Sequence, residues 1–186
     1  LGVAFTVPEG FVIDNSTGEV EATGADNLAF RFDGATVPRS MSMADYLRDG
    51  WLGGLDVPSI QSTEINGREA AVATAYGDDW QFNVTVIRVG DQVYRLLTGA
   101  PRGNERLTSV ARTIADSFRV LNRREIAALN PLRIRVVTVR PGDTIATFAN
   151  RMVGVDRKLE MFRVLNALGP GSTVSTGDKV KIVTDQ

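Results

Sequence analysis

The residues that could carry chemistry in this chain are carboxylates, hydroxyls and arginines, because its 186 residues include no histidine and no cysteine. Without these two residue types the preferred zinc ligands are missing, and neither a Ser-His-Asp nor a Cys-His arrangement can form. Carboxylates remain available for general acid–base chemistry or hard cations, but the sequence has no EF-hand loop and no P-loop. We therefore expect a chain that is no catalyst on its own and that holds no metal or cofactor.

Two charged clusters could form binding sites. Asp78 and Asp79 precede a tryptophan in a turn, where a solvated loop is a simpler interpretation than a cation site. Arg133 and Arg135 share one face of an expected strand and Arg140 follows in a turn, so they could face an anionic polymer or simply protect a sheet edge. The net charge of −1 and the lack of interleaved aromatic residues disfavour nucleic-acid binding.

Length and composition indicate one sizeable domain and a small one. Apolar residues make up 43% and charged residues 23%, which is typical of a folded globular protein. No apolar run approaches the roughly eighteen residues needed to cross a bilayer. The chain starts at Leu1 with no visible targeting signal, so we expect a fragment of a longer protein whose preceding part is missing.

Charge is distributed unevenly along the chain. Residues 1–122 carry 10 basic and 16 acidic side chains, whereas residues 123–186 carry 11 basic and 6 acidic ones. Such a contrast indicates either two units with different partners or two domains that attract each other.

The first unit is expected to be a mixed α/β domain. An extended run at 3–7, a turn at 8–10 and short strands at 18–24 and 28–34 precede a helix at 43–52 that Ser42 caps. That helix should present Met43, Leu47 and Trp51 on one face.

Two hairpins and a long helix complete this unit. The hairpins should turn at Asn66-Gly67 and at Gly90-Asp91, because Asn-Gly tolerates the positive φ angles of a type I′ turn. Asn104 is expected to cap a helix that covers one face of the sheet. Its apolar stripe has helical spacing and comprises Leu107, Val110, Ala111, Ile114, Ala115 and Phe118.

A domain boundary is expected at residues 122–130, a short linker helix capped by Asn122 and stopped before Pro131. From there the pattern is strand, helix, helix, strand. The first helix should bury Ile145, Phe148, Ala149 and Met152. The second, capped by Asp156, should bury Leu159, Phe162, Leu165 and Leu168.

The second unit resembles a LysM domain, a small βααβ module found on many cell-wall enzymes. The resemblance is carried by "VVTVRPGDTI", "FA", "VLN" and "VSTGDKVKI", over about 50 residues. Gly142 permits the corner, Asp143 or Thr144 can cap the first helix, and Asn166 can end the second in the left-handed conformation. The 22 positions from Thr144 to Asn166 indicate a longer turn between the helices than is usual in this family.

This resemblance implies a groove for N-acetylglucosamine-containing glycans between two loops. One loop comprises Gly142, Asp143, Thr144 and Ile145, and the other Ala167, Leu168, Gly169 and Pro170. Such a groove would use backbone amides and carbonyls, since no Tyr or Trp lies between Asn122 and Gln186. The competing interpretation is that Asp143 and Thr144 only cap a helix.

Two further resemblances concern the longer pattern. "FTVPEGFVIDNSTGEVEATG", "VYRLLTG", "SFRVL", "FRVLNALG" and "VKIV" in order look like the region that follows the catalytic domain in bacterial HtpX-like, CAAX-prenyl-protease-type zinc metallopeptidases. The His-Glu-x-x-His helix of those enzymes has no counterpart here, so zinc is expected only in the missing catalytic domain. The first unit alone, with its "VPEGF" opening, looks like the PsbP-like sandwich, which is a fold analogy.

The sequence therefore predicts an α+β protein with an antiparallel-sheet sandwich at 1–121, a linker helix at 122–130 and a LysM-like module at 131–186. The favoured function is a non-catalytic region of a periplasmic or cell-envelope zinc metallopeptidase, with peptidoglycan or an envelope protein as partner and the catalytic domain in cis. The alternatives are a stand-alone peptidoglycan-binding module without a protease, and a purely structural interaction domain.

Overall fold

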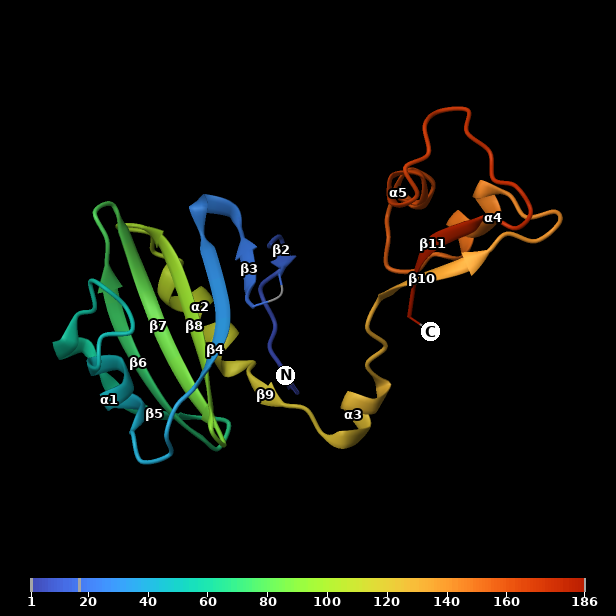
Figure 1. The fold of residues 1–186 in the computed structure, drawn as a ribbon. Coiled ribbons are helices and arrows are strands. Elements are labelled where there is room, and N and C mark those ends of the chain that lie inside the picture. Colours follow the sequence, from blue (N-terminus) through green and yellow to red (C-terminus); the bar gives the residue numbers. More distant parts are fainter. Residues whose placement is uncertain (1, 17, 186) are drawn as a thin grey trace. The chain divides into compact units, whose positions relative to one another are not determined.

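The computed structural model describes residues 2–16 and 18–185. The chain divides into two compact units, Leu1–Leu121 and Asn122–Gln186 (Figure 1). Each unit has its own apolar core, so each is described by itself. In the described residues, no helix has both the length and the apolar composition needed to cross a bilayer.

A seven-stranded antiparallel sheet forms the body of the first unit (Figure 1). In sheet order its strands are β2 (Val12–Asn15), β3 (Val20–Thr23), β4 (Ala29–Thr36), β8 (Gln92–Pro101), β7 (Trp80–Val89), β6 (Arg68–Tyr76) and β5 (Gln61–Ile65). A separate short pair joins β1 (Val3–Ala4) to β9 (Arg119–Val120). The expected strand at 3–7 is therefore shorter than predicted. The mixed α+β class, with a large antiparallel sheet and few helices, is confirmed.

Both predicted hairpin turns are confirmed. Ile65 pairs with Arg68 across Asn66 and Gly67, whose φ angles of 48° and 73° are those that a two-residue type I′ turn requires. Val89 likewise pairs with Gln92 across the second two-residue turn. The register within the β5–β6 pair and within the β7–β8 pair is thus set by local turn chemistry.

Alternation along these strands gives the sheet two apolar faces. One face packs against helix α2 (Leu107–Asp116) through a core that includes Phe30, Leu96 and Ile114. The opposite face packs against helix α1 (Met43–Arg48) through Val84, Val86 and Val93, among others. The sheet is therefore a single layer between two helices, as a sandwich requires.

Helix α1 begins as predicted and ends earlier. The Ser42 hydroxyl accepts a hydrogen bond from the backbone of Asp45 at 3.1 Å, which confirms the cap. The helix stops at Arg48, and Gly50 follows with φ of +86°. Trp51 consequently lies beyond the helix rather than on its apolar face, where its ring lies under the Arg95 guanidinium at 4.6 Å.

The N-cap of helix α2 lies two residues later than expected, at Arg106 and not at Asn104. The carboxamide oxygen of Asn104 accepts from the backbone N–H of Arg106 at 2.9 Å, which makes a turn ahead of the helix. Arg106 takes the cap position without a side-chain bond. The predicted apolar stripe is buried even so, including Phe118 beyond the helix end.

The second unit has the order strand, helix, helix, strand. Helix α3 (Arg123–Ala128), with Asn122 and Glu125 in a reciprocal capping box, comes before these four elements within the unit. The elements are β10 (Arg133–Thr138), α4 (Ile145–Arg151), α5 (Lys158–Leu165) and β11 (Lys179–Thr184). The two strands pair antiparallel, and the rings of Phe148 and Phe162 stack between the helices at 5.8 Å.

Two details of helix α5 differ from the prediction. Arg157, not Asp156, is its cap, and no side chain accepts from the free amides there. Leu159 is 44% exposed, so it does not belong to the buried face. The apolar core of the second unit includes Phe148, Met152, Phe162, Val180 and Ile182.

Candidate functional site

The corner after β10 contains four of the eight residues predicted to bind glycan. Gly142 has φ of +88°, a conformation that glycine adopts without steric cost, and no atom of the described residues lies within 4 Å of the place a Cβ would take. The backbone N–H of Asp143 donates to the carbonyl of Arg140 at 3.0 Å, and the Asp143 carboxylate accepts from the Arg140 N–H at 2.9 Å. Asp143 therefore closes the turn and does not cap the helix.

Thr144 is the cap of α4. Its hydroxyl accepts from the backbone N–H of Thr147 at 3.2 Å, while the Thr147 hydroxyl accepts from the Thr144 N–H at 3.2 Å. Ile145, the next residue, is buried in the core of the unit. Of the four residues of this loop, Gly142 and Thr144 are exposed, so a ligand here would meet backbone and one hydroxyl.

The second loop closes α5 with two hydrogen bonds. The N–H of Leu168 donates to the carbonyl of Arg163 at 2.8 Å, and the N–H of Ala167 donates to Val164 at 3.1 Å. This pair of bonds defines a Schellman motif, whose left-handed residue is commonly glycine. Here that residue is Ala167, with φ of +53°, and not Asn166 as predicted. Ala167, Gly169 and Pro170 are exposed, whereas Leu168 is half-buried.

Asn166 has a different role from the predicted one. Its carboxamide accepts from the N–H of Lys181 at 2.6 Å and donates to the carbonyl of Lys181 at 2.9 Å. It also donates to the carbonyl of Phe162 at 2.9 Å. The side chain thereby pairs with β11 as a neighbouring strand would, and it holds the end of α5 against that strand.

The two loops share one apolar anchor. Ile145 belongs to the same buried cluster against which Leu168 packs. The corner is also bonded to the return turn, since Val139 donates to the carbonyl of Asp178 at 2.8 Å and accepts from Gly177 at 2.9 Å. The loop backbones are therefore held on one small core, although two of the eight predicted side chains, Ile145 and Leu168, contribute to that core.

The other charged groups considered from the sequence make no metal site. In residues 2–16 and 18–185, no group of three or more Asp or Glu side chains could hold a metal ion. Of the adjacent acids Asp78 and Asp79, the second accepts a hydrogen bond at its backbone carbonyl from the Arg102 N–H. The ring of the following Trp80 stacks on Phe82. Arg133 and Arg135 are exposed on β10, opposite Thr184 and Ile182.

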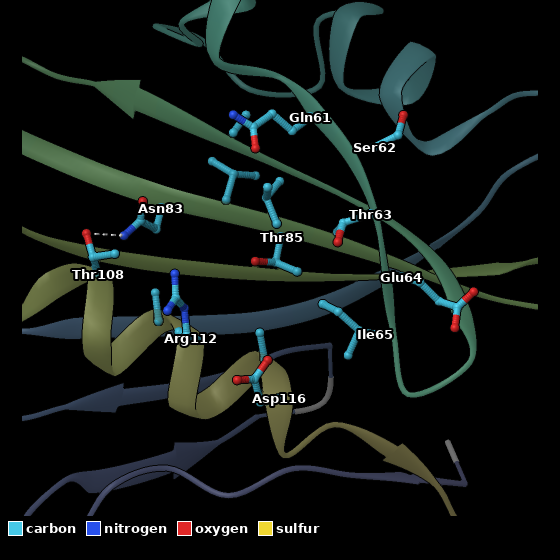
Figure 2. A pocket seen from close by; sticks show the side chains of 15 residues that line it. Gln61, Ser62, Thr63, Glu64, Ile65, Asn83, Thr85, Thr108, Arg112 and Asp116 are labelled. Atoms are coloured by element: carbon cyan, nitrogen blue, oxygen red, sulfur yellow. Dashed lines mark hydrogen bonds between the residues drawn. The ribbon is translucent and has the colours of Figure 1, made fainter.

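The first unit contains a concavity that sequence reasoning missed. A groove of about 330 Å³ lies between α2 and the β5–β7 part of the sheet (Figure 2). Polar side chains of the strands and the helix line it, including Gln61, Thr63, Asn83, Thr85 and Arg112. The signal was present in the alternation of β7, where Asn83 and Thr85 interrupt apolar residues, but such a pattern also fits a solvated face.

A second polar cluster lies among residues of the opposite face. The Asp33 carboxylate, 7% exposed, is paired with both Arg95 and Arg31. Burial lowers the pKa of Arg95, but the hydrogen bonds to Asp33 and to the Tyr46 hydroxyl outweigh it and raise that pKa above its ordinary value. Asp33 bonds to both arginines and Arg95 also bonds to Tyr46, so the cluster is explained as a structural ion-pair network.

Comparison with known proteins defines the fold and no more. No protein-family model matches the chain, and no curated protein matches it. A 1.50 Å crystal structure from Bacteroides thetaiotaomicron VPI-5482 is similar, with a TM-score of 0.53 and 10% identity over 89% of this chain. The chain spans 56% of the length of that structure.

Two further similar structures have lower scores. The solution structure of cyanobacterial PsbP (CyanoP) from Synechocystis sp. PCC 6803 has a TM-score of 0.47 and 14% identity, covering 64% of this chain and 86% of its own. A point mutant of the protein Mog1 has a TM-score of 0.47 and 9% identity, covering 66% of this chain and 93% of its own. The structural neighbours thus include a PsbP protein and Mog1, and they carry no argument about function.

Proposed function

We propose that this chain is a non-catalytic accessory region of a cell-envelope zinc metallopeptidase and that its second unit is a LysM-like module that binds peptidoglycan. Envelope proteins are the other class of partner in this proposal. The zinc would belong to a separate catalytic domain. The whole protein would act in the periplasm or at the cell envelope.

The observation that carries the glycan proposal is the pair of loops at 142–145 and 167–170. One loop lies between β10 and α4 and the other follows α5, which are the corresponding places in a βααβ module. Both loops are anchored on one apolar cluster. Their exposed parts are backbone groups and small side chains. Backbone N–H and C=O groups are suited to the acetamido groups of N-acetylglucosamine, which each offer one donor and one acceptor.

The protease link is supported by the resemblance of the chain to the region that follows the catalytic domain in HtpX-like metallopeptidases. It agrees with a sequence that has no histidine or cysteine, since an accessory region needs neither. Reading the same gene upstream of Leu1 tests this link directly. A His-Glu-x-x-His motif in frame supports it, and a reading frame without one leaves the alternative of a stand-alone glycan-binding module.

The glycan proposal is tested by titrating the N-acetylglucosamine trimer into the isotope-labelled chain and following its amide resonances. We expect shifts confined to residues 142–145 and 167–170, with saturation. The variant Asp143→Ala separates the two interpretations of the corner, because among the described residues the Asp143 carboxylate bonds only to the turn. If Asp143→Ala lowers the thermal stability and the unmodified chain shows no saturable shift, the corner is a purely structural element.

A further inference from the structure

The groove of the first unit holds polar groups that the fold does not use. Thr85 is 6% exposed, and its hydroxyl has no hydrogen-bond partner among the residues that the structure describes. Every side-chain N or O atom of the described residues that is sealed from solvent has a hydrogen-bond partner. The Thr85 hydroxyl must therefore open into the groove, where it lies among the lining side chains (Figure 2).

Arg112 supplies the principal charge of the groove. Figure 2 shows its side chain pointing from α2 toward β7, the strand that carries Asn83 and Thr85. Within residues 2–16 and 18–185, the guanidinium has neither an ion-pair partner nor a hydrogen-bond partner. Five N–H donors in a planar fork match a carboxylate, which can accept two of them side by side.

The remaining lining groups select a ligand with both donors and acceptors. Gln61 and Asn83 carry carboxamides, and Thr63 and Thr108 carry hydroxyls. The amide of Asn83 donates to the hydroxyl of Thr108 at 3.4 Å, a long bond that a ligand could replace. Peptide groups have the complementary donor and acceptor on each residue.

Two carboxylates restrict how much negative charge the groove accepts. Asp116 lies one turn after Arg112 on α2, Glu64 lies on β5, and both line the groove. A single carboxylate beside Arg112 is compatible with them, whereas a polyanion is not. Among the described residues, no aromatic ring lines the groove, so a ligand held by ring stacking, such as a nucleobase, is disfavoured.

We propose that this groove binds a short peptide segment that carries one free carboxylate, with Arg112 pairing to that carboxylate and Thr85, Asn83 and Gln61 bonding to peptide groups. The volume is at the small end of ligand sites, which suits about two or three residues. The carboxylate could be a chain terminus or an acidic side chain, since the chemistry is shared. This inference is independent of glycan binding by the second unit.

The test is calorimetric titration of the intact chain with three probes, supported by amide chemical shifts. The probes are Ala-Ala-Ala as the free acid, Ala-Ala-Ala amide, and acetyl-Ala-Glu-Ala amide. Binding of the free acid alone identifies a chain terminus, and binding of the glutamate peptide identifies a side chain. Absence of binding by both carboxylate probes, or equal binding of Ala-Ala-Ala amide, overturns the proposal.

Variants connect the binding to the groove. We expect Arg112→Gln to weaken binding of the carboxylate probe by about tenfold, equal to about 1.4 kcal/mol, because the charged partner of the carboxylate is lost. Arg112 is exposed, so its replacement does not disturb the core. Thr85→Val should weaken binding without changing the preference for a carboxylate. The matched control is Arg68→Gln, an exposed arginine outside the groove, which should bind as the unmodified chain does. Unchanged affinity in Arg112→Gln would overturn the assignment.

Discussion

The side chain of Asn166 forms a two-point hydrogen-bonded pair with the backbone of Lys181, accepting at 2.6 Å and donating at 2.9 Å. One carboxamide thus joins the end of α5 to the free edge of β11. Fifteen positions separate the two residues, so the bond is tertiary. It places the loop at 167–170 relative to the β10–β11 pair, and the other loop follows β10.

Replacement of Asn166 by alanine should destabilise the second unit by about 2 kcal/mol, because the N–H and C=O of Lys181 lose their partner. Hydrogen exchange at the Lys181 amide reports the change locally, and we expect faster exchange there. The control is Asn150→Ala, since Asn150 is exposed on α4 and its side chain forms no hydrogen bond in the described part of the chain. Equal exchange rates in both variants would contradict the role given to Asn166.

Ala167→Gly should stabilise the same unit by up to about 1 kcal/mol. The left-handed conformation destabilises a residue that has a Cβ by about 1–2 kcal/mol. Glycine removes this strain but loses more backbone entropy on folding, so the net gain is smaller. Chemical denaturation measures the change. The same substitution inside a helix, Ala146→Gly in α4, should have the opposite sign. A loss of stability at both positions would show that the Ala167 conformation carries no strain.

Acid should weaken the start of α1. The pKa of the Asp45 carboxyl lies below its ordinary value of 3.8, because the Ser42 hydroxyl and then Arg48 donate hydrogen bonds to it. A lowered folded-state pKa means that the stabilisation is complete above the ordinary pKa and is lost as the pH falls through the folded-state value. We expect the stability difference between the unmodified chain and Asp45→Asn to shrink as the pH falls below about 4. A difference that grows on acidification would contradict this assignment.

Limited proteolysis should cleave between Leu121 and Leu132. Ile126, Leu129 and Leu132 are each about half exposed, and α3 is a helix of only six residues. Exposed, weakly held backbone is the preferred substrate of proteases. Trypsin can cut at Arg123 and Arg124 and should release two stable fragments. Protection of this whole segment would show that it is packed in solution.

Local chemistry explains what could be predicted from the sequence. The Asn66-Gly67 turn, the Ser42 and Asn122 caps and the capping role of Thr144 depend on residues at most three positions apart. Long-range partners explain the misses. Asn166 was predicted to be left-handed because asparagine tolerates that conformation, yet its bond to Lys181 draws it into a different role. The groove was missed because the polar alternation of β7 does not reveal that α2 lies beside it.

Glycan recognition by the second unit is the central claim, and co-sedimentation of the intact chain with purified peptidoglycan sacculi tests it most directly. The salt dependence matters because this unit is basic, and the screening length falls from about 10 Å at 0.1 M salt to about 3 Å at 1 M. Gly169→Gln provides a blocking variant, since a Cβ at Gly169 meets only Ser172 Oγ at 3.9 Å and its φ needs no glycine. Gly53→Gln, in an open loop of the first unit, is its matched control.

We predict binding that survives high salt, is lost in Gly169→Gln and is retained in Gly53→Gln. Binding that disappears at high salt, or that Gly169→Gln leaves unchanged, would contradict glycan recognition by these loops.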